Sequence, residues 1–144
     1  AGIDRLITMD LHADQIQGFF DVPVDHLYAS GVFLPYIESL QLEDLVIATP
    51  DGVVQNAPAL IPNIWVYLGA LQQERLKANE VATMQIIGDV KNKNVILIDD
   101  MVDTAGTITK AADIMKEAGA ISVRAIASHC VMSVLHLNAF RTPA

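Results

Sequence analysis

Residues 95–107 read Val95-Ile96-Leu97-Ile98-Asp99-Asp100-Met101-Val102-Asp103-Thr104-Ala105-Gly106-Thr107. An apolar run thus ends in two carboxylates, and small and hydroxyl-bearing residues follow soon after. Apolar residues then recur at helical spacing as far as residue 118, where Gly119 supplies a stop, and a second apolar run occupies residues 123–127. This order of strand, loop, helix, glycine and strand across residues 94–128 predicts a βαβ unit.

Similar short apolar runs occupy residues 6–9 and 45–48. Runs of this kind are typical of strands that are buried on both faces of a parallel sheet. Helical patterns at residues 14–20 and 32–40 lie between them, whereas Pro58 and Pro62 interrupt residues 52–71 and leave that stretch unassigned. We therefore expect a three-layer α/β fold, an open parallel sheet flanked by helices, that forms a single domain over residues 1–144.

Composition limits the classes of function. The 144 residues are 52% apolar and 18% charged, which excludes overall disorder, and the net charge of −8 argues against binding to nucleic acids or anionic membranes. No apolar run approaches the roughly 20 residues that span a bilayer. Cys130 is the single cysteine, so the sequence predicts no disulfide framework, a cytoplasmic location and a buried thiol. The chain begins with Ala1 rather than Met, and we expect it to be a piece of a longer protein.

The loop that follows the apolar run at residues 95–98 carries the strongest functional signal. Small residues at Ala105 and Gly106 allow an anion to approach the main chain, and the first N–H groups of a helix can hold a phosphate without a lysine. Thr104 and Thr107 add hydroxyl donors. Three nearby carboxylates disfavour a bare phosphate and indicate sugar hydroxyls, a divalent cation or both; they are Asp99, Asp100 and Asp103. The pattern predicts a site for a phosphorylated sugar, and the alternative is a plain helix cap formed by Asp103 or Thr104.

A second group of polar residues follows the first predicted strand. Asp10 and His12 come directly after it, and Asp21 and Asp25 flank the turn at Pro23. Carboxylate oxygens and one imidazole near a sheet edge predict a site for magnesium and a nucleotide. The alternatives are a histidine of the core at position 12 and solvated turn residues at positions 21 and 25.

Both segments resemble a known family. Residues 99–107 look like the ribose 5-phosphate loop of the ribose-phosphate pyrophosphokinases, also called phosphoribosyl pyrophosphate synthetases, and residues 8–25 resemble that family's divalent-cation signature. The resemblance implies a phosphoribosyltransferase-like fold. It also implies that residues 99, 100 and 103–107 bind ribose 5-phosphate, that His12 contacts magnesium or nucleotide phosphates, and that Asp10, Asp21 and Asp25 belong to the cation signature.

Two shorter matches concern the nucleotide side of the reaction. Residues 48–51 end like the family's Ser/Thr-Pro-Asp, which implies that Asp51 is a second magnesium ligand. Arg75 occupies the place of an arginine that supports the transferring group, but Gln73 stands where the family has a catalytic lysine, and Lys77 lies two residues too late for that place. Loss of that positive charge predicts slow or absent turnover. The resemblance fails over most of residues 52–72 and again after residue 133.

The resemblance as a whole implies a transferase of nucleotide biosynthesis, a kinase that moves a diphosphate group. Its partners are ATP and ribose 5-phosphate and its cofactor is Mg²⁺. Members of the family work as oligomers, so we expect a cytoplasmic homo-oligomer. Gln73 favours a first alternative, a non-catalytic relative that binds the sugar phosphate or partners an active synthetase. A second alternative is a phosphoribosyltransferase, which shares the phosphate loop but not the cation signature at residues 10–25.

Overall fold

The structure is a computed structural model, and it describes residues 2–50, 69–74 and 83–133. Within these ranges the elements are, in chain order, β1 (Leu6–Met9), the 3-10 helix η1 (Asp14–Phe19), β2 (Val24–Leu27), α1 (Ser30–Ser39), β3 (Leu45–Thr49), β4 (Gly69–Glu74), β5 (Thr83–Ile87), β6 (Asn94–Val102), α2 (Gly106–Glu117) and β7 (Ser122–Cys130). No helix in the described part of the chain is long and apolar enough to cross a membrane.

Five strands form the main sheet in the order β5-β4-β3-β6-β7. β3 runs parallel to β4 and β6, and β6 runs parallel to β7. β5 is antiparallel to β4, so the sheet is mixed at one edge rather than wholly parallel as the sequence predicts. The order places β3 and β6 inside the sheet, where apolar side chains can be covered on both faces.

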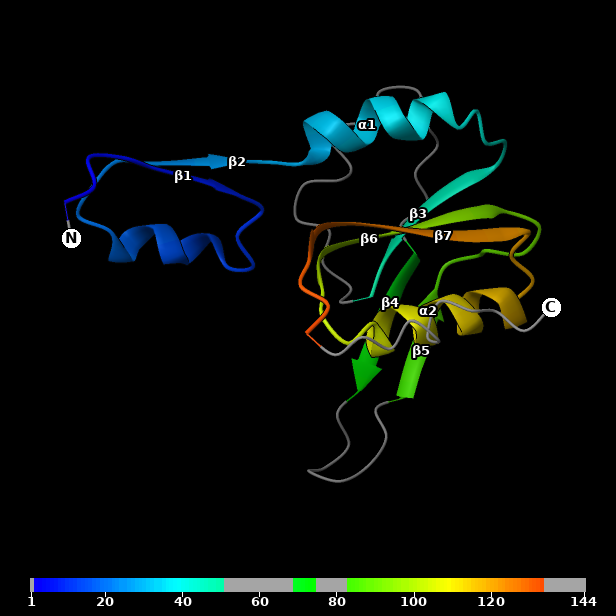
Figure 1. Cartoon of the computed structure of the whole chain (residues 1–144). Helices are drawn as coiled ribbons and strands as arrows, with labels where there is room; N and C mark the ends of the chain where they lie inside the picture. Colours follow the sequence, from blue (N-terminus) through cyan, green and yellow to red (C-terminus); the bar gives the residue numbers. More distant parts are fainter. Residues whose placement is uncertain (1, 51–68, 75–82, 134–144) are drawn as a thin grey trace.

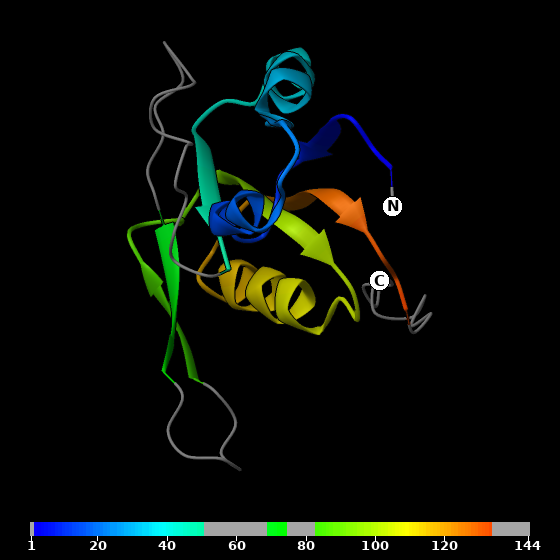
Figure 2. The ribbon, with the colours of Figure 1, turned by 90° about the vertical axis from the view of Figure 1, so that its left-hand side faces the viewer.

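One helix covers each face of this sheet. Figure 1 shows α1 above the sheet and α2 below it, and Figure 2 shows the same order of layers from the side. The side chains of β3 and β6 alternate between the two helices because successive residues of a strand point to opposite faces. The α2 face contains Val46, Ala48, Val95 and Leu97 with Ile108, Ala111 and Met115 of the helix. The α1 face contains Leu45, Ile47 and Ile96 with Ile37 of the helix. The predicted three-layer α/β fold is confirmed.

The βαβ unit of β6, α2 and β7 is also confirmed, with both strands longer than the apolar runs that predict them. α2 ends at Glu117, and the predicted glycine follows directly after its C-cap, Ala118. Gly119 has a φ of 94°, and the N–H of Ala120 reaches the carbonyl oxygen of Met115 at 3.1 Å. This bond pattern belongs to a Schellman motif, which favours glycine at the left-handed position. The turn sends β7 back along β6 in parallel register from Asn94↔Ser122.

β1, η1 and β2 form an N-terminal arm that lies beside the main sheet rather than within it (Figure 1). β1 pairs in parallel with β2, from Leu6↔Val24 to Met9↔Leu27. The predicted strand at residues 6–9 is therefore correct, but its predicted burial on both faces is wrong. Ile7 is 66% exposed because one face of this two-stranded sheet, which lies outside the main layers, is not covered by the described residues.

Candidate functional site

The loop between β6 and α2, together with the first turn of α2, encloses a pocket of about 220 Å³. Its walls are His12 and residues 99–108. α2 begins after Ala105, which has a φ of 62°, and no side chain caps the helix. The first N–H groups of a helix have no partner within it, and they carry the positive end of the helix dipole. This wall of the pocket can therefore hold an anion.

Asp103 has a different role from the predicted helix cap. Its Oδ1 accepts the backbone N–H of Ser133 at 3.0 Å and also the hydroxyl of Ser133. These hydrogen bonds hold the pKa of Asp103 below its usual value, and the bond from the Ser133 hydroxyl has a larger effect than the bond from the Ser133 backbone N–H. The carboxylate thus stays ionised and ties the loop to the residues after β7. The alternative that Asp103 or Thr104 caps α2 is wrong, because neither side chain bonds to the helix end.

Asp99 and Asp100 lie on β6, just before the loop. The strand is paired with β7 at Asp99↔Ala127, which fixes the backbone that carries both acids. The backbone N–H of Asp100 donates to Oδ1 of Asp99 at 2.9 Å. Both side chains are half-buried and line the pocket. The two carboxylates therefore supply hydrogen-bond acceptors at the opposite end of the lining segment from the first turn of α2.

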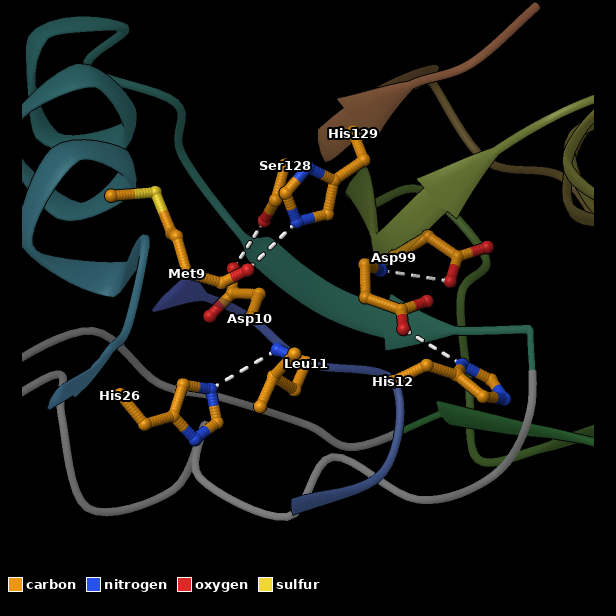
Figure 3. A network of polar contacts seen from close by, with 9 residues as sticks. Met9, Asp10, Leu11, His12, His26, Asp99, Ser128 and His129 are labelled. Carbon is orange, nitrogen blue, oxygen red and sulfur yellow. Dashed lines mark hydrogen bonds and ion pairs between the residues drawn. The ribbon is translucent and has the colours of Figure 1, made fainter. Parts of the chain in front are cut away.

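His12 reaches the same pocket from the turn between β1 and η1. Its Nδ1 lies 2.7 Å from Oδ2 of Asp100 (Figure 3). A carboxylate can only accept a hydrogen bond, so Nδ1 carries the proton and Nε2 carries the lone pair in the neutral ring. The side chain is 71% exposed, so the alternative of a core histidine is wrong. The tertiary structure thus brings the two sequence motifs into one site.

Asp10 joins the N-terminal arm to the main sheet. Its Oδ1 accepts the backbone N–H of Ala29 at 3.1 Å, and its Oδ2 accepts the hydroxyl of Ser128 on β7. The next residue of β7, His129, places its Nε2 2.8 Å from the carbonyl oxygen of Met9 (Figure 3). Asp10 adopts a φ of 42°, a left-handed conformation that Asp tolerates better than most residues. These contacts hold the turn that carries His12.

Asp21 and Asp25 lie away from the pocket. Asp21 is exposed, as expected for a solvated turn residue. Asp25 forms a two-pronged ion pair with Arg5, with Nη2 and Oδ1 2.8 Å apart, and the hydrogen bonds from Arg5 hold the pKa of Asp25 below its usual value. Within the described ranges, no three His, Cys, Asp or Glu side chains come together as possible metal ligands. The prediction that Asp10, His12, Asp21 and Asp25 gather is therefore wrong, because Asp10 and Asp25 each face a partner elsewhere.

The pocket nevertheless offers donors that suit magnesium. Mg²⁺ prefers oxygen ligands, keeps several waters and is usually bound by one or two carboxylates together with substrate phosphates. The carboxylates of Asp99 and Asp100 are such a donor set. The described residues thus fit an ion that shares its ligands with a bound phosphate.

Three residues that the sequence predicts for the nucleotide side of the site lie outside the described residues: Asp51, Arg75 and Lys77. Their assignments stay predictions. Gln73 belongs to β4, opposite Met84 of the antiparallel strand β5. The strand ends at Glu74, so Arg75 and Lys77 both come directly after it in the sequence.

Sequence reasoning missed residues that hold the site from outside. Ser128 and Ser133 anchor Asp10 and Asp103, and His26 accepts a hydrogen bond from Leu11. Each of these residues is separated in sequence from the residue that it contacts, and no spacing pattern in the sequence links the two. The position of Ser128 next to His129, near the end of a predicted strand, was the one available signal.

The exposure of Cys130 differs from the prediction. The thiol belongs to an exposed residue, so the prediction of a buried small side chain is wrong. The reason is its position, because β7 is an edge strand of the main sheet and Cys130 is its last residue.

A model of the phosphoribosyl transferase domain family matches residues 36–135. The ribose-phosphate pyrophosphokinase of Porphyromonas gingivalis is 65% identical over 135 residues, which cover 92% of this chain and 43% of that protein. The enzyme of the same name from Campylobacter jejuni is 52% identical over 134 residues, with the same two shares. The resemblance predicted from the motifs is confirmed, and the chain spans less than half the length of these relatives.

Solved structures agree on the fold. The phosphoribosylpyrophosphate synthetase from Mycobacterium smegmatis superposes with a TM-score of 0.79 at 37% identity, over 96% of this chain and 45% of that one. The purine phosphoribosyltransferase from Pyrococcus horikoshii has a TM-score of 0.56 at 20% identity, over 92% of this chain and 83% of that one. The second likeness concerns the fold alone. Together they confirm the predicted phosphoribosyltransferase-like architecture.

Proposed function

The chain belongs to the phosphoribosyl transferase domain family, and we propose that it is a ribose-phosphate diphosphokinase domain within that family. Such a domain transfers a diphosphate group from ATP to ribose 5-phosphate and yields phosphoribosyl pyrophosphate and AMP. One observation carries the proposal: a single pocket joins the uncapped end of α2 to two carboxylates and to His12. The relatives named above support the choice of reaction.

Ribose 5-phosphate binds along the lining segment. The first N–H groups of α2 and the hydroxyls of Thr104 and Thr107 receive the 5-phosphate. Asp99 and Asp100 accept hydrogen bonds from the sugar hydroxyls. The pocket has a volume of about 220 Å³, and we place one sugar phosphate in it.

The transfer forms one bond and breaks another. The anomeric hydroxyl oxygen bonds to the β-phosphorus of ATP, the bond from that phosphorus to the oxygen shared with the α-phosphate breaks, and AMP leaves. The hydroxyl proton is released to solvent, and His12, oriented by the bond between its Nδ1 and Asp100, contacts magnesium or the nucleotide phosphates, as the resemblance implies. Magnesium, when bound with the phosphates near Asp99 and Asp100, offsets the negative charge on their oxygens. By resemblance, Asp51 is a further magnesium ligand and Arg75 supports the transferring group.

The same proposal covers the remaining expectations. Residues 1–144 form a single domain of a cytoplasmic homo-oligomer, with ATP and ribose 5-phosphate as substrates and Mg²⁺ as cofactor. The net charge of −8 supports small-molecule substrates over nucleic acid or an anionic membrane.

Binding is tested by titrating the full chain with ribose 5-phosphate while the amide signals of residues 104–107 are followed by NMR. We expect these signals to shift and saturate, because their N–H groups receive the phosphate. Ribose without the phosphate is the matched control and should leave them in place. Unchanged amides at saturating ribose 5-phosphate would refute the proposed site.

Turnover is tested by AMP formation from ATP in the presence and absence of ribose 5-phosphate. We expect AMP only when the sugar phosphate is present, and a faster rate in Gln73→Lys. A single missing charge in such a site typically costs about 10²–10³ in rate. Binding of ribose 5-phosphate with no AMP from either chain would favour the non-catalytic relative. Pyrophosphate release from phosphoribosyl pyrophosphate and a nucleobase would favour the phosphoribosyltransferase.

A further inference from the structure

His26 is a buried histidine on β2 whose ring faces the turn that carries His12. Its side chain is only 5% exposed, and its Nε2 accepts the backbone N–H of Leu11 at 3.0 Å (Figure 3). A ring nitrogen that accepts a hydrogen bond has no proton, so the proton of the neutral ring is on Nδ1. Nδ1 lies 3.4 Å from Oδ1 of Asp14, a carboxylate that can accept it.

The rest of the ring is also held. The ring of Tyr28 packs against the imidazole at a centroid distance of 4.7 Å. The amide nitrogen of Gln17 lies 3.3 Å from Nδ1, but it is a donor like the protonated Nδ1, so the acceptor for that proton is Asp14. Asp14 and Gln17 both belong to η1, which begins directly after the turn. The imidazole therefore lies between η1 and residue 11, with Nδ1 facing Asp14 of η1 and Nε2 facing the backbone N–H of Leu11.

Leu11 stands between two residues that are held from other directions. Asp10, before it, is bonded to Ala29 and Ser128, and His12, after it, is bonded to Asp100. The three contacts come from different elements, so together they fix both the place and the direction of the turn. Two bonds to the turn come from within the N-terminal arm itself: the one from Leu11 to the His26 ring, and the one from the Asp10 N–H to the carbonyl oxygen of Leu27 at 3.0 Å.

We propose that His26 is a positioning residue for His12. Its Nε2 holds the Leu11 backbone, and the backbone in turn sets the angle at which the His12 ring meets Asp100 and the pocket. The catalytic side of this proposal rests on the proposed function above. Its structural side, the coupling of the His26 acceptor to the orientation of His12, does not depend on turnover.

A pair of substitutions separates the acceptor from the bulk of the ring. His26→Phe keeps a buried aromatic ring and removes the acceptor, whereas His26→Gln keeps an oxygen acceptor on a side chain of similar reach. Tyr28→Leu is the packing control, because it removes the ring contact and leaves the acceptor. All three are made in the full chain.

Two NMR measurements test the structural side. In His26→Phe we expect the Leu11 amide to exchange with solvent about tenfold faster, the change that corresponds to losing one ordinary hydrogen bond, and the His12 ring signals to move. In His26→Gln and Tyr28→Leu both should stay near those of the unchanged chain. Equal Leu11 exchange in the Phe and Gln variants, or unmoved His12 signals in His26→Phe, would overturn the proposal.

Kinetics test the catalytic side. We expect His26→Phe to lower kcat for AMP formation while KM for ribose 5-phosphate stays unchanged, because the phosphate wall on α2 is built from other residues. His26→Gln should restore kcat. If the NMR results hold but neither the unchanged chain nor Gln73→Lys forms AMP, the proposed function fails and the positioning role stands. If the chain turns over and His26→Phe has normal kcat, the positioning role fails.

Discussion

Replacing Thr107 with glutamate tests where the phosphate binds, because it should change stability and binding in opposite directions. Thr107 is exposed in the first turn of α2, which contains no acidic residue and has no side-chain cap. A carboxylate there interacts favourably with the helix dipole by about 0.3–1 kcal/mol. For a chain of this size, that gain corresponds to a rise in Tm of about 1–4 °C.

The same carboxylate repels a phosphate bound to the first turn. Two unit charges about 4 Å apart interact by about 1 kcal/mol in water and about 4 kcal/mol near a protein surface. Because a phosphate monoester carries nearly two charges at neutral pH, the repulsion is at least about 2 kcal/mol. Ribose 5-phosphate should therefore bind Thr107→Glu about 30-fold more weakly or worse.

Thr107→Gln is the control, since it has the same length and no charge. Thermal unfolding and calorimetric titration of both variants give the two quantities directly. If Thr107→Glu binds ribose 5-phosphate as tightly as Thr107→Gln, the phosphate does not lie at the end of α2. If the glutamate variant melts below the glutamine variant, the helix end does not favour an anion, and the argument fails at its physical basis.

Three further predictions concern the residues that support the site. Met115→Ala should lower the free energy of unfolding by about 2–5 kcal/mol, because Met115 is fully buried against the sheet, and urea unfolding with an unchanged midpoint would contradict this. Ser133→Ala should raise the pKa of Asp103 toward its usual value, as followed by carboxyl NMR. Because the pKa of Asp103 is lower in the folded protein, its ionised carboxylate stabilises the fold above the usual pKa, and this stabilisation is lost as the pH falls through the lowered pKa. The free energy of unfolding of Ser133→Ala should therefore fall less steeply with acid. An identical Asp103 titration in the variant would show that the Ser133 hydroxyl does not lower this pKa. Asp10→Ala should cost about 1–3 kcal/mol because it leaves a buried backbone N–H unpaired, whereas Asp21→Ala should stay within about 0.5 kcal/mol; equal unfolding free energies would refute the structural role of Asp10.

The order of elements along the chain was predictable because each signal is local. The apolar run before Asp99, the helical spacing up to Gly119 and the run after it specify β6, α2 and β7 without reference to any other segment. The antiparallel edge strand β5 was not predictable in the same way. Its direction depends on its pairing with β4, which lies in the stretch where the sequence has no clear period.

In the candidate site, too, the features that depend on neighbouring residues were predictable and those that depend on distant residues were not. The wall of the pocket that we propose for the phosphate is continuous in sequence, so residues 99–107 predicted that wall together with its small residues and acids. The predicted metal cluster failed because spacing in the sequence does not determine side-chain direction. Asp25 faces Arg5 across the arm, and Asp10 faces Ser128 across the boundary with the main sheet.

The amino-acid sequence alone determined the βαβ unit, the loop that opens α2 and the family resemblance, because backbone preference and local hydrogen bonding act over a few residues. Only the tertiary structure decided that His12 meets Asp100, that Ser133 holds Asp103, and that His26 holds Leu11. These contacts join residues far apart in the chain, or residues on different elements. They form only when the packing of the arm and of β7 against β6 has brought the donors within hydrogen-bonding distance of their acceptors.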